Sequence, residues 1–262
     1  GQPILGRRET IARFTREDIV AHIRKYYGTR DVIIACAGNF SCDELMALLN
    51  DCFSPLRCGS ETRPGRPPLF QPSLKVVSKD LSEAHLLIGV PAISQTSGER
   101  YALFVLNTVL GGSVSSRLFQ EIRENRGLAY SVYSYTAQYA DTGLWGVYAG
   151  VSRKKVREVA GLVIREMDSL GDTLTEDDLE MAKQHLKGNM ILALESTNSR
   201  MNNIARQEIY FNRYISPDEI MRSVEKVSLR EVRGLAAELI RRDRMAITAY
   251  GPLDRDALGD VL

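Results

Sequence analysis

The sequence predicts an α+β fold arranged in two similar lobes. Helix starts are marked by capping boxes, in which a Ser or Thr precedes an acidic residue by three positions. Short apolar runs of β-forming residues alternate with these helices. An internal repeat relates the beginning of the chain to its end, which indicates the two lobes.

The capping boxes are the clearest local signals. They occur at Thr15…Asp18, Ser41…Glu44, Thr175…Asp178, Ser216…Glu219 and Ser228…Glu231. Helices are therefore expected from about residues 16, 42, 176, 217 and 229. Further helices are expected over residues 99–110, 115–125 and 153–169.

Apolar runs rich in Val, Ile and Leu predict the strands. We expect strands at residues 32–36, 75–77, 85–90 and 245–250, and a hairpin formed by residues 128–139 and 143–150. Between Pro55 and Pro72 the chain holds five prolines interspersed with Gly, Ser and Arg. This composition is typical of a linker between two lobes.

The internal repeat appears when residue n is aligned with residue n + 213. Thr15 then matches Ser228, Ile34 matches Ile247 and Gly38 matches Gly251. A cap, helix, strand and glycine turn also occur together by chance, because the template is common. If the repeat is genuine, about 140 residues of a first lobe precede this chain. The expected domains are then the end of a first lobe (1–54), a linker (55–74) and a second lobe (75–262).

The charge balance excludes two classes of partner. The 34 basic and 33 acidic side chains nearly cancel, so the sequence predicts neither a nucleic-acid interface nor binding to an anionic membrane. The sequence contains no run of about 18 apolar residues, so no transmembrane helix is predicted. The N-terminus shows no signal-peptide pattern. The chain starts with Gly1 rather than with methionine, which suggests a truncated or processed start.

The four cysteines lack the spacing of a metal site or a disulfide framework. They are Cys36, Cys42, Cys52 and Cys58. Cys36 lies in an apolar run and Cys52 in a helical pattern, so buried free thiols are expected. This usage fits a reducing, intracellular compartment, with the bacterial cytoplasm favoured over the mitochondrial matrix.

Several separated motifs resemble one known family. They are LGGSVSSRLFQEIRENRGLAYSV at residues 110–132, LESTNSRM at 194–201, FTRED at 14–18 and AGN at 37–39. Together they resemble the zinc metallopeptidases of the pitrilysin and mitochondrial-processing-peptidase type (the insulinase superfamily). The resemblance covers essentially the whole chain and follows the order of the family's motifs.

The resemblance implies a duplicated two-lobe metallopeptidase fold, with mixed or antiparallel sheets packed with helices. Its two lobes close over a peptide, so the implied function is a zinc-dependent endopeptidase acting on peptides or unfolded segments. Members bind zinc in the first lobe through a His-x-x-Glu-His helix. Here the histidines are His22, His85 and His185, none of them in such a motif. No metal ligand is therefore assigned, zinc is expected in the parent protein only, and the chain alone is expected to be inactive.

Two residues are identified by the resemblance as catalytic contacts of the second lobe. Arg123 and Tyr130 match the arginine and tyrosine that reach across the cleft to the scissile peptide. A phenol O–H or a guanidinium stabilises the negative charge of a carbonyl under attack, and an Arg fork can hold a substrate carbonyl. From spacing alone, an Arg that offsets a helix dipole and a Tyr in a half-buried strand account for the same residues.

Neighbouring residues have structural interpretations. Gly111-Gly112 predicts a tight turn rather than a phosphate loop, and Tyr133, Tyr135 and Tyr139 predict a packed aromatic strip, with peptide contact as the alternative. His85, on an apolar strand, is expected to be a partly buried ring with a hydrogen-bond partner.

Two rival functions stay open. One is a non-catalytic partner subunit that keeps the peptidase fold and supplies half of the cleft, and the other is a generic α+β ligand-binding domain. The expected partners are a peptide substrate, the protein's own N-terminal lobe, and a second copy or a related subunit.

Overall fold

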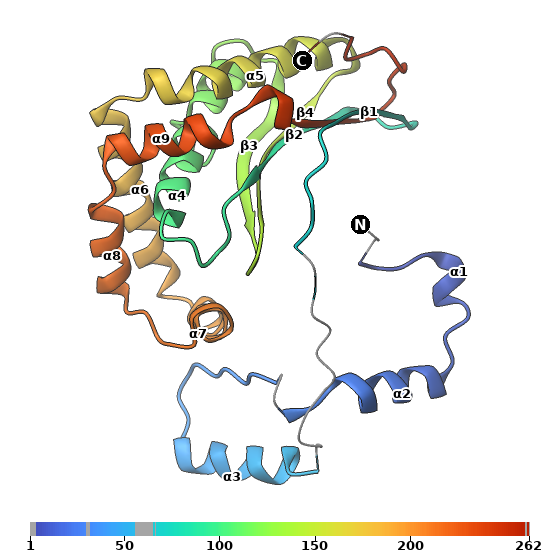
Figure 1. Ribbon diagram of the computed structural model, residues 1–262, viewed down its shortest axis with the longest axis vertical. Helices are drawn as coiled ribbons and strands as arrows, with labels where there is room; N and C mark the ends of the chain where they lie inside the picture. Colours follow the sequence, from blue (N-terminus) through green and yellow to red (C-terminus); the bar gives the residue numbers. More distant parts are fainter. Residues whose placement is uncertain (1–3, 30–31, 56–64, 66, 260, 262) are drawn as a thin grey trace. The chain divides into compact units, whose positions relative to one another are not determined.

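The computed structural model describes residues 4–29, 32–55, 65, 67–259 and 261 (Figure 1). The chain divides into two compact units. The first comprises the described residues within 1–66 together with Thr197–Ile209, and the second comprises the described residues of 67–196 and 210–262. Half of the linker expected at 55–74 lies outside the described residues, and the predicted domain boundaries stay a prediction.

Helices and strands alternate along the chain. The helices are α1 (Arg8–Ile11), α2 (Arg16–Tyr26), α3 (Cys42–Phe53), α4 (Arg100–Leu110), α5 (Val156–Thr173), α6 (Glu176–Ala193), α7 (Thr197–Phe211), α8 (Pro217–Glu225) and α9 (Leu229–Leu239). Shorter turns are the π-helix η2 (Phe119–Glu124) and the 3-10 helices η3 (Arg153–Lys155) and η4 (Arg242–Arg244). The strands are β1 (Ser73–Ser78), β2 (Ala84–Ala92), β3 (Ala129–Gln138), β4 (Gly143–Val151) and β5 (Ala246–Gly251).

The strands of the second unit form one mixed sheet in the order β1-β5-β2-β4-β3. Strand β1 runs parallel to β5. The pairs β5–β2, β2–β4 and β4–β3 are antiparallel. The predicted hairpin is the β3–β4 pair, in which Tyr133 lies opposite Tyr148 and Gln138 opposite Gly143. The α+β prediction and the mixed sheet are thus confirmed.

Helices α4, α5 and α9 cover one face of this sheet (Figure 1). Alternate residues of the strands point into the resulting core, as period-2 alternation requires. The fully buried side chains of the core include Leu86, Ile88, Trp145, Val147, Ile247, Leu103, Leu106, Val163, Met167, Leu170 and Leu235. This core fixes the sheet on which the candidate site is built.

Helix starts follow the capping boxes. At α2, α6 and α9 the hydroxyls of Thr15, Thr175 and Ser228 accept from the third residue of the helix, and that residue's carboxylate accepts from the cap's backbone N–H. Single caps, Ser41 and Ser216, begin α3 and α8. All five predicted starts are confirmed, because these bonds are local.

Two predicted helices differ in type. The helix expected at 115–125 is largely the π-helix η2, and the one expected at 153–169 opens with η3 before α5. Among the described residues, no helix combines the length and the apolar character needed to cross a membrane.

The first unit corrects two expectations. Residues 32–36 form no strand, because no strand of the described chain lies beside them to accept and donate ladder hydrogen bonds. Cys36 and Cys52 are free but exposed rather than buried, because no core packs around this segment. Cys58 lies outside the described residues.

The repeated segment differs in burial between the two units. In the second unit Val232 of α9 and Ile247 of β5 are fully buried. Their counterparts in the first unit, Ile19 and Ile34, are 54% and 43% exposed. The same apolar pattern is therefore buried in the second unit, where a sheet and helices pack on it. In the described part of the first unit it stays exposed.

The hydrogen bond between Asn107 and Trp145 gives a test of the core. The buried indole N–H of Trp145 donates to Asn107 Oδ1 at 3.1 Å. Asn107→Ala leaves this N–H without a partner, so we expect the free energy of unfolding to fall by about 1–3 kcal/mol. Urea unfolding followed by circular dichroism measures it. Asn203→Ala, on the exposed side of α7, is the control, and equal stability of both variants would contradict the role of Asn107.

Candidate functional site

The turn after α4 holds the candidate site against the sheet. Ser134 of β3 donates its backbone N–H to the Gly111 carbonyl at 3.1 Å, and its hydroxyl to the Asn107 carbonyl at 2.9 Å. A Cβ on Gly111 would lie 2.5 Å from the Ser134 nitrogen, so only glycine allows this approach. The predicted tight turn at Gly111-Gly112 is confirmed.

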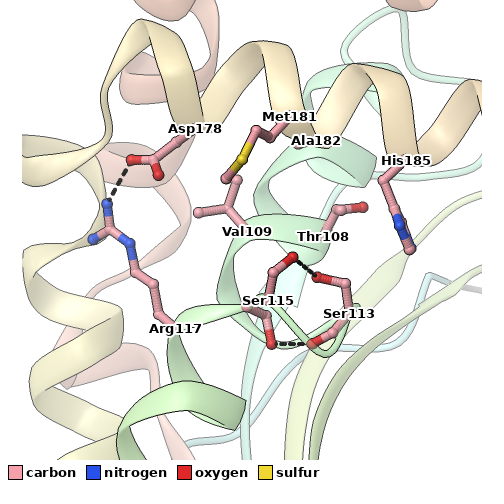
Figure 2. Close-up of a pocket in the computed structure, with 10 residues that line it drawn as sticks. Thr108, Val109, Ser113, Ser115, Arg117, Asp178, Met181, Ala182 and His185 are labelled. Carbon is pink, nitrogen blue, oxygen red and sulfur yellow. Dashed lines mark hydrogen bonds and ion pairs between the residues drawn. The ribbon is translucent and has the colours of Figure 1, made fainter.

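An ion pair fixes the other side of the same turn. Arg117 donates to Asp178 of α6 at 3.1 Å and to the hydroxyl of Thr173 at the end of α5. Figure 2 shows this pair beside a small pocket between α4, the turn and α6. The pocket's buried hydroxyls are bonded within the protein, Thr108 to the Phe104 carbonyl and Ser116 to the Ser113 carbonyl. These two hydroxyls thus have their hydrogen-bond partners within the protein.

The next helix along the chain is η2, whose shape places Arg123. The Asn125 N–H donates to the Gln120 carbonyl, five residues back, which is the π-helical pattern. Gly127 then adopts φ +59° and donates its N–H to the Arg123 carbonyl, ending the helix. Ile122 is fully buried, whereas the neighbouring Arg123 is half-buried.

Tyr130 leaves the sheet through a β-bulge. Ala129 pairs with Val151 and Ser131 pairs with Gly150, so Tyr130 is an extra residue in β3. A bulge of this kind redirects a side chain. Tyr130 is accordingly 83% exposed, although it lies next to the buried Ala129.

The structure brings both sequence-predicted site residues into contact. The Arg123 guanidinium carbon lies 5.1 Å from the centre of the Tyr130 ring. Arg123 is 38% exposed, and its Nε lies 3.9 Å from Glu124 Oε1. Within the described chain, no acceptor hydrogen-bonds to the guanidinium and no partner to the Tyr130 hydroxyl. Their N–H and O–H groups are thus available to a bound molecule, and their catalytic role stays a prediction.

Phe119 is a neighbour of this pair that no motif in the sequence singled out. The centre of its ring lies 4.8 Å from the Arg123 guanidinium carbon, on the same helix η2. The four-residue spacing between Phe119 and Arg123 is the signal that predicts such a contact.

Aromatic side chains also lie on the sheet face that α4, α5 and α9 do not cover. The Tyr133 ring lies 5.2 Å from that of Tyr148 and 6.2 Å from that of Tyr135. Tyr135 lies over Gly146, where a Cβ would approach its ring to 2.9 Å. The packed aromatic strip is confirmed for Tyr133 and Tyr135, whereas Tyr139 lies beyond the end of β3 and is exposed.

The histidines and acids do not fit a metal. His85 Nδ1 hydrogen-bonds to the Tyr148 hydroxyl at 2.8 Å, which confirms the expectation of a partly buried, partnered ring. His185 bonds to Asn189, and His22 packs on Tyr26. No cluster of three His, Cys, Asp or Glu suited to a metal ion occurs among the described residues.

The described part of the chain is an α+β domain in which no metal site occurs. The family model described as the peptidase M16 inactive domain matches residues 13–186. The chain therefore belongs to the peptidase M16 family, and the resemblance seen in the sequence is confirmed.

Its curated relatives include bacterial proteins named as zinc proteases. An uncharacterized zinc protease of Streptomyces coelicolor is 34% identical over 97% of this chain and 57% of the relative. The uncharacterized zinc protease YmxG of Bacillus subtilis is 35% identical over 93% of the chain and 59% of the relative. The chain thus spans less than two thirds of the length of these relatives.

Solved structures share the fold. A peptidase M16 inactive domain from Pseudomonas fluorescens superposes with a TM-score of 0.85 at 22% identity, over 94% of this chain and 60% of that one. A chain of Complex III2 from Candida albicans superposes with a TM-score of 0.82 at 20% identity, over 100% of this chain and 63% of that one. At these identities the similarity supports the fold.

The Arg117–Asp178 pair gives a test in the acid range. Burial raises the pKa of the Asp178 carboxyl, but the hydrogen bonds from Thr175 and Arg117 together lower it by more than burial raises it. The pKa therefore lies below its ordinary value. A carboxyl with a lowered folded-state pKa stabilises the protein above its unfolded pKa of about 4, and this contribution is lost as the pH falls through the folded-state pKa. We expect Asp178→Asn to unfold more easily than wild type at pH 7 and to approach it as the pH falls.

Urea unfolding at several pH values, followed by the fluorescence of the single tryptophan, Trp145, measures this difference. Asp177→Asn, the exposed neighbour on α6, is the control for the change in net charge. A stability difference between Asp178→Asn and wild type that is constant with pH would contradict the assigned ion pair.

Proposed function

We propose that this chain is the C-terminal part of a zinc-dependent metalloendopeptidase that cleaves peptides or unfolded segments. In this proposal the chain supplies the second lobe, which binds substrate and stabilises the transition state. The observation that carries it is the pair Arg123 and Tyr130, whose side chains touch, are solvent-accessible and have unused donors. The zinc-protease names of the relatives support the reaction class.

The two side chains suit complementary tasks at a peptide bond. The planar Arg123 guanidinium can donate two parallel N–H bonds to backbone carbonyls of a bound peptide. The Tyr130 O–H can donate to a carbonyl oxygen as negative charge develops there. Since both lie on elements anchored in the core, their donors are held in place before substrate binds.

An extended peptide is the substrate form that suits this surface. A strand-like peptide can pair with a sheet edge through its backbone, which gives loose side-chain specificity. The aromatic strip of Tyr133, Tyr135 and Tyr148 belongs to the same sheet as Tyr130 and offers apolar contact area there.

The zinc of this proposal is bound by another lobe of the parent protein. The donor sets of the described residues do not fit a metal ion, so no step is assigned to zinc in this chain. The relatives are longer than this chain, which leaves room for an N-terminal lobe that pairs with it. We place the parent in the bacterial cytoplasm, and cell fractionation tests that placement.

The Arg123–Tyr130 pair is tested in the parent protein. We expect Arg123→Ala and Tyr130→Phe each to lower kcat/KM for an internally quenched, unstructured peptide about 10²- to 10³-fold, because each removes a donor from the transition state. Zinc content should stay unchanged, since neither residue is a ligand in the proposal.

Arg126→Ala and Tyr139→Phe are the matched controls, because both residues are exposed and near the pair in sequence. Undiminished cleavage by Arg123→Ala and Tyr130→Phe would return both residues to structural roles and favour a non-catalytic partner subunit. The 262-residue chain alone is expected to cleave none of the peptide.

A further inference from the structure

Arg123 is held differently from the other arginines near it. Arg126 donates through Nε and Nη2 to Glu121, and Arg117 donates to Asp178. The Arg123 guanidinium instead lies against two aromatic rings, 4.8 Å from the centre of Phe119 and 5.1 Å from that of Tyr130. Its nearest carboxylate oxygen, on Glu124, is at 3.9 Å, beyond hydrogen-bonding distance.

This difference determines what the guanidinium can still bind. A carboxylate that fixes an arginine occupies two of its five N–H donors. An aromatic face attracts the cation through the ring quadrupole and leaves the N–H groups at the edge of the guanidinium plane unoccupied. Arg123 is therefore restrained in position without losing the donors that a peptide carbonyl would need.

Phe119 is placed to provide this restraint. Phe119 is the first residue of η2 and is half-buried. Leu118, which precedes it, and Ile122, within the helix, are fully buried. Leu118 and Ile122 already attach the helix to the core, whereas the Phe119 ring contacts Arg123. A side chain four residues earlier on a helix lies beside its partner.

We infer that Phe119 is a positioning residue that holds the Arg123 guanidinium beside Tyr130 with its N–H donors directed to substrate. This inference rests on the proposed function, in which Arg123 contacts the peptide. Phe119 acts through Arg123 and makes no contact with the reacting atoms.

The test is a double-mutant cycle in the metal-loaded parent protein, with an internally quenched, unstructured peptide as substrate. Phe119→Leu is expected to lower kcat/KM about tenfold, because a misplaced guanidinium binds the carbonyl poorly. The same substitution in an Arg123→Ala background is expected to cause no further loss, since there is no guanidinium left to position. Phe119→Tyr, which keeps the ring, is expected to retain activity.

Two further variants separate positioning from packing. Phe119→Met keeps an apolar side chain of similar length without a ring and should behave like Phe119→Leu. Either variant can therefore make the test if the other folds poorly. Phe104→Leu removes another half-buried ring, which packs on Tyr101 of α4, and should leave kcat/KM unchanged.

Different results would contradict the role of Phe119 and the proposed function. Losses that add in the double variant, or an undiminished kcat/KM in Phe119→Leu and Phe119→Met, would overturn the positioning role while the effect of Arg123→Ala keeps the proposed function. An undiminished kcat/KM in Arg123→Ala would overturn the proposed function, and the role of Phe119 with it.

Discussion

Asn107 joins helix α4 to two strands of the sheet, and the candidate site depends on this connection. Its side-chain oxygen accepts the buried indole N–H of Trp145 on β4, and its carbonyl accepts the Ser134 hydroxyl on β3. The same carbonyl accepts the N–H of Gly111, whose own carbonyl accepts from Ser134. The end of α4, the following turn and β3 are thus one bonded network, in which each bond restricts the others. The turn precedes η2 in the chain, so the position of the half-buried Arg123 depends on buried groups.

The sequence predicts what is local and misses what needs a distant partner. The capping-box pattern located the starts of α2, α3, α6, α8 and α9, because in each the cap hydroxyl accepts from the residue three positions later, and at α2, α6 and α9 the reciprocal bond closes the box. The strand expected at 32–36 needs a neighbouring strand, and its apolar pattern says nothing of whether one is present. The bulge at Tyr130 depends on the alignment of β3 with β4, and the π-turn of η2 on how Leu118 and Ile122 meet the core. Neither is encoded in a local pattern.

The internal repeat also shows that a local apolar pattern does not by itself predict burial. Ala249 on β5 is fully buried, whereas Cys36, at the matching position of the first unit, is exposed. An apolar pattern predicts which face of a segment is suited to burial, but the hydrophobic contribution arises only when other elements remove that face from water. The prediction that Cys36 and Cys52 are buried failed for this reason, although the pattern on which it was based is real.

For the site, the sequence alone left two explanations of Arg123, and both stay open in the structure, where Arg123 lies in the last turn of η2. An arginine that offsets a helix dipole needs only to lie near the last carbonyls, and one that stabilises a fold pairs with a carboxylate, as Arg117 and Arg126 do. Neither role requires a contact with an exposed tyrosine on a bulged strand. Arg123 makes that contact and leaves its donors unoccupied within the described chain. A guanidinium that lies against ring faces, with its hydrogen-bonding edge open, is what the proposed contact with a peptide requires, and these ring contacts distinguish Arg123 from Arg117 and Arg126.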